Sequence, residues 1–267
     1  LATNLSKDRF EVFVAAGGKN ELAEKLINAG IPYFEIKSFQ KNVSIIKDIL
    51  AYFEIFFLLR KIKPDIIHVN SSKAGGIVGM AAFDYRFLSF KFGLKTIFTA
   101  HGWAFHEKRP QPQILLIKLF TRVTCFFYSK IICVSEYDRQ SAIKNRIAPK
   151  RKLITIHNGI DINEYKFLEN DSAKNKLFEL LKISHMRNFQ QNIIIGTIGE
   201  FTKNKGQEYL IEAAKKLQVS GSRFQVIIIG WGELESKLRD KIKNENLENH
   251  VFLLNNIPQA ATYLKAF

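Results

Sequence analysis

The segment Ile193–Leu217 reads IIIGTIGEFTKNKGQEYLIEAAKKL and gives the strongest indication of the fold. Its continuous apolar run from Ile193 to Ile195 is typical of a parallel strand that is covered on both faces. A turn rich in Gly and Lys follows this strand, and an amphipathic helix begins directly after the turn. This order predicts a strand–turn–helix unit of an α/β protein with mostly parallel sheets.

The turn contains residues that suit an anionic ligand. Gly199 and Gly206 let the backbone approach a ligand closely, and Lys203 and Lys205 bring positive charge to the start of the helix. We therefore predict that this turn binds a diphosphate. The alternative is a purely structural turn with solvated lysines, because the pattern is neither a P-loop nor a dinucleotide fingerprint.

Length, composition and charge limit the possible classes of protein. A chain of 267 residues with 46% hydrophobic and 24% charged residues predicts a folded protein of two domains. The net charge of +15 favours anionic partners such as nucleotide diphosphates, nucleic acid or an acidic bilayer surface. Because the charge is dispersed and no nucleic-acid-binding motif is present, we predict no nucleic-acid partner.

The chain contains two cysteines, Cys125 and Cys133, which are too few for a disulfide framework and lack the spacing of metal ligands. We interpret them as small apolar residues in a reducing cytosol. No segment gives the ~20 mainly apolar residues of a spanning helix, and no signal peptide is visible. The prediction is a cytoplasmic protein.

Both ends break off in helical patterns and no initiator Met is present, so we expect a fragment truncated at both ends.

Short apolar segments alternate with longer helical patterns along the chain, which is typical of βαβ units. The predicted strands cover residues 10–15, 31–36, 65–70, 94–100, 130–135, 152–157, 193–199, 224–230 and 250–254. The predicted helices cover residues 20–29, 43–61, 113–128, 207–217 and 234–244. We predict a Rossmann-like domain at residues 1–160 without its first strand, a connector at 161–191, and the first half of a second Rossmann-like domain at 192–267.

Two segments in the N-terminal part place polar residues directly after a strand. Ser71, Ser72 and Lys73 offer hydroxyls, backbone N–H groups and positive charge to an anion, although simple N-capping by a serine explains them equally well. His101 follows a strand and precedes a glycine, so it is suited to donate to a sugar hydroxyl or a phosphate. The alternative for His101 is a structural role.

Three further segments carry weaker indications. Ser135 is the predicted N-cap of a helix, with acidic residues in its first turn. Asn158-Gly159 predicts a tight turn at the exit from the first domain, with a possible hinge role. The sequence GWGELE at residues 230–235 lacks the third glycine of a dinucleotide fingerprint. No Asp-x-Asp pair occurs in the chain, which disfavours a metal-dependent nucleotide-sugar site.

Seven ordered segments resemble bacterial glycosyltransferases of family four, particularly those that build capsule, exopolysaccharide or O-antigen units. They are HVNSSKAGGIVGMAA, TAHGWAF, VSEYDRQ, ITIHNGID, IGTIGEFTKNKGQEYLIEAA, VIIIGWGELESKL and VFLLNNIPQAATYLKAF. The resemblance implies a GT-B fold of two Rossmann-like domains. It also implies sugar transfer from a UDP- or GDP-sugar with retention of configuration, without a cofactor or an essential metal.

The residues of the family carry over to specific positions. The histidine that contacts the transferred sugar matches His101, and the lysine that binds the donor diphosphate matches Lys205. The backbone that holds the base corresponds to residues 255–257, around Asn256. Gly199 and Lys203 belong to the same donor turn. Preorganised charge of this kind stabilises a departing diphosphate.

Three departures from the family pattern affect these implications. Many members have Arg where this chain has Glu200, a carboxylate that repels a phosphate unless Lys203 compensates or Glu200 faces away. The glycine-rich loop of the family would precede residue 1, and its E-x7-E segment would follow residue 267. We therefore expect the chain by itself to fold in part and to be inactive.

The expected partners are the nucleotide sugar, a saccharide or lipid-diphosphate-linked acceptor, and the inner face of the plasma membrane. Residues 43–60 and 114–130 form basic helices with many aromatic or apolar residues, which suit docking on anionic lipid. The alternative is that these faces are domain core. Two other functions stay open, a GT-B sugar-nucleotide epimerase and a non-catalytic degenerate paralogue.

Overall fold

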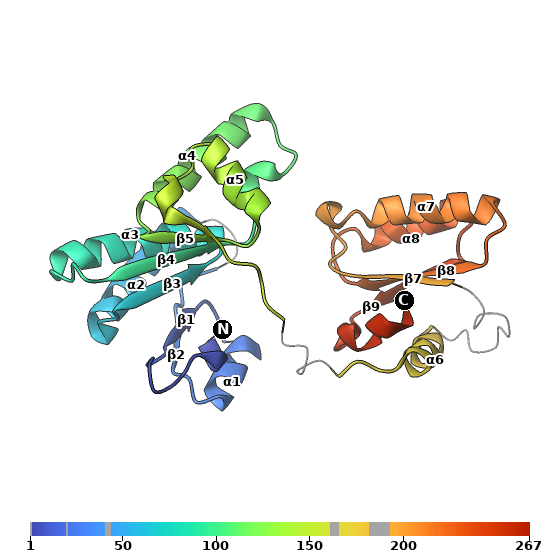
Figure 1. The fold of residues 1–267 in the computed structure, drawn as a ribbon, viewed down its shortest axis with the longest axis horizontal. Helices are drawn as coiled ribbons and strands as arrows, with labels where there is room; N and C mark the ends of the chain where they lie inside the picture. The colour runs from blue at the N-terminus through green and yellow to red at the C-terminus, as the bar shows by residue number, and fades with distance from the viewer. Residues whose placement is uncertain (1, 20, 41–43, 161–165, 182–192) are drawn as a thin grey trace. The chain divides into compact units, whose positions relative to one another are not determined.

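The computed structural model describes residues 2–19, 21–40, 44–160, 166–181 and 193–267. They form two compact units, Leu1–Asn158 (unit 1) and Gly159–Phe267 (unit 2). Every strand pair in both units is parallel, which confirms the predicted α/β class. Figure 1 shows the helices of each unit lying against its sheets.

Unit 1 alternates strands and helices along most of its length. Its elements are β1 (Val14–Ala16), α1 (Glu21–Asn28), β2 (Tyr33–Glu35), α2 (Ile45–Ile62), β3 (Ile66–Asn70), α3 (Ser72–Leu88), β4 (Lys95–Ala100), α4 (Gln111–Phe126), β5 (Lys130–Cys133), α5 (Glu136–Lys144) and β6 (Leu153–Thr155). The strands form a two-stranded sheet, β1-β2, and a four-stranded sheet, β3-β4-β5-β6. Each of the predicted strands of this unit is present, and each is shorter than predicted.

The first strand differs most from its prediction, which was residues 10–15. β1 begins only at Val14, and its register places Val14 opposite Tyr33 and Ala16 opposite Glu35. Residues 10–13 were wrongly assigned to the strand because β2 has only three residues and offers them no partner. The apolar pattern of the segment was correct, but its pairing depends on the length of a strand elsewhere in the chain.

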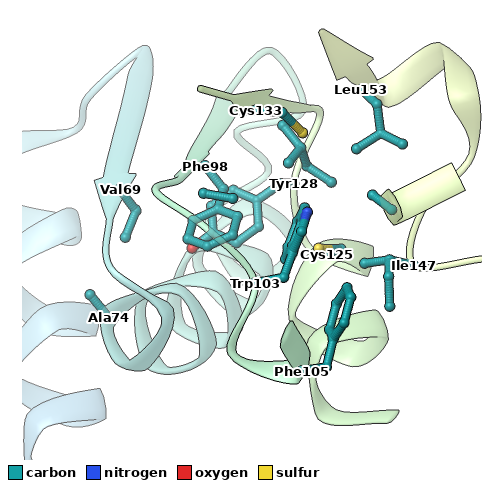
Figure 2. Packing of buried hydrophobic residues seen from close by; sticks show 13 residues of the cluster. Val69, Ala74, Phe98, Trp103, Phe105, Cys125, Tyr128, Cys133, Ile147 and Leu153 are labelled. Carbon is teal, nitrogen blue, oxygen red and sulfur yellow. The ribbon is translucent and has the colours of Figure 1, made fainter. Parts of the chain in front are cut away.

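The main core of unit 1 lies between the four-stranded sheet and helices α4 and α5. Figure 2 shows Phe98 of β4 beside Tyr128. The centroids of the two rings are 5.3 Å apart. Cys125 and Cys133 belong to the same cluster and are free thiols, as the sequence predicted. Burial raises the pKa of Cys125 to about 12 and that of Cys133 to about 11, so both remain protonated.

A second cluster in unit 1 joins α2 to α3. Ala51, Ile55 and Leu59 of α2 pack with Ala81 and Tyr85 of α3. The spacing of four residues along α2 is that of one helix face. Other apolar residues of α2 point away from this face and are exposed: Ile45, Ile46, Ile49, Leu50, Phe53 and Phe57. The core interpretation of this helix is therefore correct for one face only.

Unit 2 has one three-stranded sheet with the order β7-β8-β9. Its elements are α6 (Asn170–Leu180), β7 (Ile193–Ile198), α7 (Gln207–Val219), β8 (Phe224–Gly230), α8 (Glu235–Asn244), β9 (Val251–Asn255) and the 3-10 helix Ala260–Ala266. Figure 1 shows α7 and α8 on one face of the sheet and α6 beyond the other face.

The alternation of β8 explains these two layers. Val226 and Ile228 face the cluster formed with α7 and α8, whereas Ile227 and Ile229 face the cluster that includes α6. Side chains alternate between the faces of a strand, so a strand covered on both faces is mostly apolar, and Gln225 is the polar exception in β8. All seven residues of β8 are buried.

Helix α6 lies inside the segment for which the sequence predicts a connector. Its buried residues Ala173, Leu177 and Phe178 pack against Ile194 and Ile229 of the sheet. Because these contacts belong to the core of unit 2, α6 extends this unit toward the N-terminus.

No helix in the described part of the chain combines the length and the apolar character that crossing a membrane requires.

Candidate functional site

In a parallel sheet the carboxyl ends of the strands share one edge, where ligands bind in open α/β folds. At this edge of unit 1, Asn70 ends β3 and pairs in register with Thr99 of β4. His101 comes two residues later and is exposed. Its Nε2 lies 3.4 Å from Oδ1 of Asn70, so the two side chains meet across the ends of two strands. The prediction for His101 did not include Asn70.

The loop after His101 is anchored in the core. Gly102 has a φ of +119°, a conformation that L side chains rarely adopt. The indole N–H of Trp103 donates to the carbonyl oxygen of Asp138 at 2.8 Å, and the Trp103 ring stacks on Phe105 (Figure 2). His101 is therefore separated from this buried anchor by Gly102 alone.

His68 lies on β3, two residues before Asn70. Sequence analysis did not identify it as a site residue. Its Nε2 is 2.7 Å from the hydroxyl of Thr99. Burial, followed by the charge of His101, lowers the pKa of His68. His68 and His101 are both exposed at this edge of the sheet.

The three residues of the predicted anion site have different surroundings. Ser71 is the N-cap of α3, and its hydroxyl accepts a hydrogen bond from the amide of Ala74 at 3.4 Å. The capping alternative therefore holds for Ser71, which also has an unusual φ of 81°. Ser72 is exposed at the first position of the helix. Lys73 forms an ion pair with Asp48 at 2.8 Å and donates to the carbonyl oxygen of Gln40, so its charge is partly neutralised.

The start of α5 forms another hydrogen-bonded cluster at the same edge. Ser135 caps the helix as predicted, because its hydroxyl accepts from the amide of Asp138 at 3.0 Å. Glu136 accepts from the hydroxyl of Thr155 on β6 at 2.5 Å and from Arg139 and Gln140. The hydrogen bond from Thr155, supported by those from Gln140 and Arg139, lowers the pKa of Glu136 to about 2. Glu136 is therefore a carboxylate at neutral pH.

Asn158 and Gly159 lie at the boundary between the two units, as a hinge would require. The predicted tight turn is wrong, because residues 156–160 form no turn and neither Asn158 nor Gly159 has a positive φ. The hinge role itself stays a prediction.

In unit 2 the turn after β7 carries the predicted diphosphate-binding residues. Lys203–Lys205 form a short 3-10 helix, and Gly206 enters α7 with a φ of +69°. The aliphatic part of Lys205 lies beside Gly199, with Cδ 4.0 Å from where a Cβ of that glycine would be. Lys203 and Lys205 are exposed, and no carboxylate of the described residues lies within 4.0 Å of either ammonium group.

Glu200, the unusual carboxylate of this turn, is also exposed. Its carbonyl oxygen accepts a hydrogen bond from the side chain of Gln207, the first residue of α7, at 2.8 Å. Within the described ranges Glu200 forms no ion pair with Lys203 or Lys205, so the positive charge of the turn is not cancelled by direct contact.

Two glycines let the ends of β7 and β8 approach closely. A Cβ atom on Gly230 would lie 2.0 Å from the carbonyl oxygen of Gly199, and one on Gly232 would lie 2.7 Å from that of Phe201. The residue between them, Trp231, accepts a hydrogen bond from the amide of Phe201 at 2.6 Å. The sequence indicated a strand-to-helix turn at GWG. In the structure its two glycines allow two backbones to come into close contact.

Asn256 follows β9 at the same edge. It has a φ of 50°, and its amide donates to the carbonyl oxygen of Gly230 at 3.4 Å. A hydrogen bond with the side chain of Asn255 lowers the pKa of Glu235 at the start of α8, and a hydrogen bond from Arg239 lowers it further. The edge of unit 2 therefore brings the ends of all three strands into one hydrogen-bonded surface.

Across the described ranges, no group of three or more His, Cys, Asp or Glu residues is arranged to hold a metal ion. The absence of a metal from the reaction stays a prediction.

Comparison with known proteins finds a matching protein family for each unit. Residues 1–164 match the family described as Glycosyltransferase Family 4, and residues 182–266 match the family described as Glycosyl transferases group 1. A UDP-Gal:alpha-D-GlcNAc-diphosphoundecaprenol alpha-1,3-galactosyltransferase of Escherichia coli is 26% identical over 263 residues, which are 95% of this chain and 64% of the relative. The capsular polysaccharide biosynthesis glycosyltransferase CapM of Staphylococcus aureus is 24% identical over 74% of this chain and 49% of the relative.

Solved structures show the same fold. HepE of Anabaena in complex with UDP superposes with a TM-score of 0.69 at 20% identity and covers 95% of this chain and 64% of its own. A UDP-GlcNAc 2-epimerase of Neisseria meningitidis bound to UDP-GlcNAc gives a TM-score of 0.53 at 15% identity over 95% of this chain and 66% of its own. These likenesses confirm the predicted GT-B fold. This chain spans about two thirds or less of the length of these four proteins.

Proposed function

The chain belongs to glycosyltransferase family 4, and on this basis we propose that the protein transfers a sugar from a UDP- or GDP-sugar to a saccharide or lipid-diphosphate-linked acceptor during surface polysaccharide synthesis. The printed activity of the E. coli relative, which names a UDP-sugar and a diphosphoundecaprenol acceptor, supports this proposal. The UDP in the HepE complex supports the choice of donor class.

The observation that carries the proposal is the turn after β7. Lys203 and Lys205 are exposed before the start of a helix, Lys205 lies beside Gly199, and no carboxylate of the described residues is in direct contact with either lysine. Free backbone N–H groups and the helix dipole add to the attraction for a phosphate. We assign the donor diphosphate to this turn and the base of the donor to the backbone around Asn256.

In unit 1 we assign the transferred sugar to His101. Its exposed ring is held beside Asn70 by the anchored loop that follows it. Ser71 and Ser72 offer a weaker second site for an acceptor phosphate, since Lys73 is already paired with Asp48.

The proposed reaction retains the anomeric configuration and uses neither a metal nor a cofactor. Negative charge develops on the departing diphosphate in the transition state, and charges fixed in advance stabilise it without reorganisation. The two lysines and the start of α7 supply this stabilisation in place of a divalent cation.

The test measures sugar transfer from UDP- and GDP-sugars by the protein at its full natural length, with Lys205→Ala and His101→Ala as variants. We expect each variant to lower kcat by about 100-fold. Lys216→Ala is the matched control, because Lys216 is an exposed lysine near the other end of α7. Full turnover of both variants would overturn the site assignment. Conversion of the sugar nucleotide without an acceptor would identify an epimerase, and no turnover of any donor would favour the non-catalytic paralogue.

We also propose that the protein works in the cytoplasm, on the inner face of the plasma membrane, with α4 as the lipid-facing surface. This surface consists of the exposed residues Leu115, Leu116, Leu119, Phe120, Val123 and Phe126. Only Cys125 of this helix is buried, and α4 contains Lys118 and Arg122 but no acidic residue. An apolar surface flanked by positive charge complements an anionic bilayer.

A further inference from the structure

Trp231 is an unusual surface residue. Its side chain is 56% exposed, whereas the other tryptophan of the chain, Trp103, is 5% exposed. Within the described part of the chain, no ring contact, cation–π contact or hydrogen bond involves the indole of Trp231. The indole is not part of the neighbouring core cluster, which contains the fully buried Phe201 instead. The fold thus presents a large flat aromatic surface to solvent.

The backbone of Trp231 is held on both sides. Its carbonyl oxygen accepts from the amide of Phe201, in the turn after β7. The carbonyl oxygen of the preceding Gly230 accepts from the amide of Asn256, after β9. Trp231 therefore stands at the end of the central strand, between the two segments to which we assign the diphosphate and the base.

The spacing of the strands connects these segments to one ligand. Neighbouring strands lie about 4.8 Å apart, so the ends of β7 and β9 are separated by roughly 10 Å. A nucleotide whose diphosphate lies at the turn after β7 and whose base lies near Asn256 must pass over the end of β8. The residue that it meets there is Trp231.

We propose that the indole of Trp231 stacks on the base of the donor nucleotide, an inference that rests on the proposed donor site. Every base has a π-face, so a stacking platform accepts pyrimidines and purines alike and contributes affinity without choosing between them. In this arrangement Lys203 and Lys205 bind the diphosphate, and the indole of Trp231 stacks on the face of the base. The backbone around Asn256 recognises the edge of the base.

The experiment measures dissociation constants of UDP, GDP and inorganic pyrophosphate by calorimetry on the protein at its full natural length. We expect Trp231→Ala to weaken UDP or GDP binding by about tenfold and to leave pyrophosphate binding unchanged. Trp231→Phe keeps an aromatic face and should stay within about threefold of the wild type. Val219→Ala is the control, because Val219 is an exposed apolar residue at the far end of α7.

Tryptophan fluorescence gives a second reading on the same samples. The nucleotide that binds should quench the wild type, and Trp231→Phe, which lacks the exposed indole, should show less quenching than the wild type. Nucleotide affinity unchanged in Trp231→Ala, or quenching in Trp231→Phe equal to that of the wild type, would overturn the stacking proposal.

Lys205→Ala separates this proposal from the one on which it rests. If Lys205→Ala abolishes pyrophosphate binding while Trp231→Ala changes nothing, only the stacking proposal falls. If Trp231→Ala weakens nucleotide binding while Lys205→Ala leaves pyrophosphate binding intact, the diphosphate assignment falls and the stacking proposal stands. Failure of all three ligands to bind the wild type would overturn both.

Discussion

Gly199 and Gly230 meet backbone to backbone at the end of two neighbouring strands. The amide of Gly199 donates to the carbonyl oxygen of Ile229 at 2.9 Å, and a Cβ atom on Gly230 would lie 2.0 Å from the carbonyl oxygen of Gly199. No side chain fits between them. The position of the lysine turn relative to the end of β8 therefore requires a residue without a side chain at position 230.

Gly230→Ala should destabilise unit 2 by about 1–3 kcal/mol, because the added methyl group meets backbone that cannot rotate away. Denaturant unfolding followed by circular dichroism measures this loss. The control is Gly93→Ala, where no atom lies within 4 Å of the added Cβ. An equal stability of the wild type and Gly230→Ala would contradict the close approach.

The carboxylate of Glu136 should stabilise unit 1 in a defined range of pH. Its pKa is lowered from 4.5 to about 2, chiefly by the hydrogen bond from Thr155. The stability that this contributes is present above about pH 4.5 and is lost as the pH falls to about 2. Thr155→Val should raise the pKa of Glu136 toward its usual value, as measured by NMR titration. Thr121→Val is the control, since its hydroxyl donates to a carbonyl inside α4. A Glu136 pKa that does not move in Thr155→Val would disprove the assigned cause.

His68 should make unit 1 sensitive to mild acid. Burial and His101 lower its pKa from 6.5, so the folded state binds fewer protons than the unfolded chain just below this pH. Stability should therefore fall as the pH drops from about 6.5 through the pKa of the folded protein. Unfolding curves recorded across this range should show a smaller loss for His68→Gln than for the wild type. The same loss in both proteins would exclude His68 as its source.

The exposed face of α4 should carry the affinity for lipid. We expect the double variant Leu116→Glu and Phe120→Glu to lose most of its co-sedimentation with anionic vesicles, since both the apolar contact and the charge balance change. Both side chains are exposed, so the fold should survive. Val219→Glu places a new carboxylate on an exposed apolar position of unit 2 and serves as control. Unchanged co-sedimentation of the double variant would remove α4 as the docking surface.

Patterns within a short segment predicted the local structure well. β8 has the predicted bounds, because an apolar run from Val226 to Ile229 that ends at a glycine allows few other assignments. The cap at Ser135 and the glycine before α7 were visible for the same reason, since each depends on neighbours within four residues.

Contacts between distant segments were not predictable in this way. Lys73 was expected to be available for an anion, but Asp48 lies 25 positions earlier and nothing in either local pattern joins them. Asn70 and His101 are likewise brought together only by the register of β3 on β4. The sequence showed Trp231 between two glycines but not that its side chain is exposed while nearby Phe201 is buried in the core.

The two thiols have a practical consequence for the folding of this protein. Cys125 and Cys133 are 1% and 0% exposed, both lie in unit 1, and the chain has no other cysteine. An alkylating reagent needs an accessible thiolate, which the folded core supplies at neither position. The rate of alkylation therefore measures how often unit 1 opens, and it does so without any contribution from the opening of unit 2.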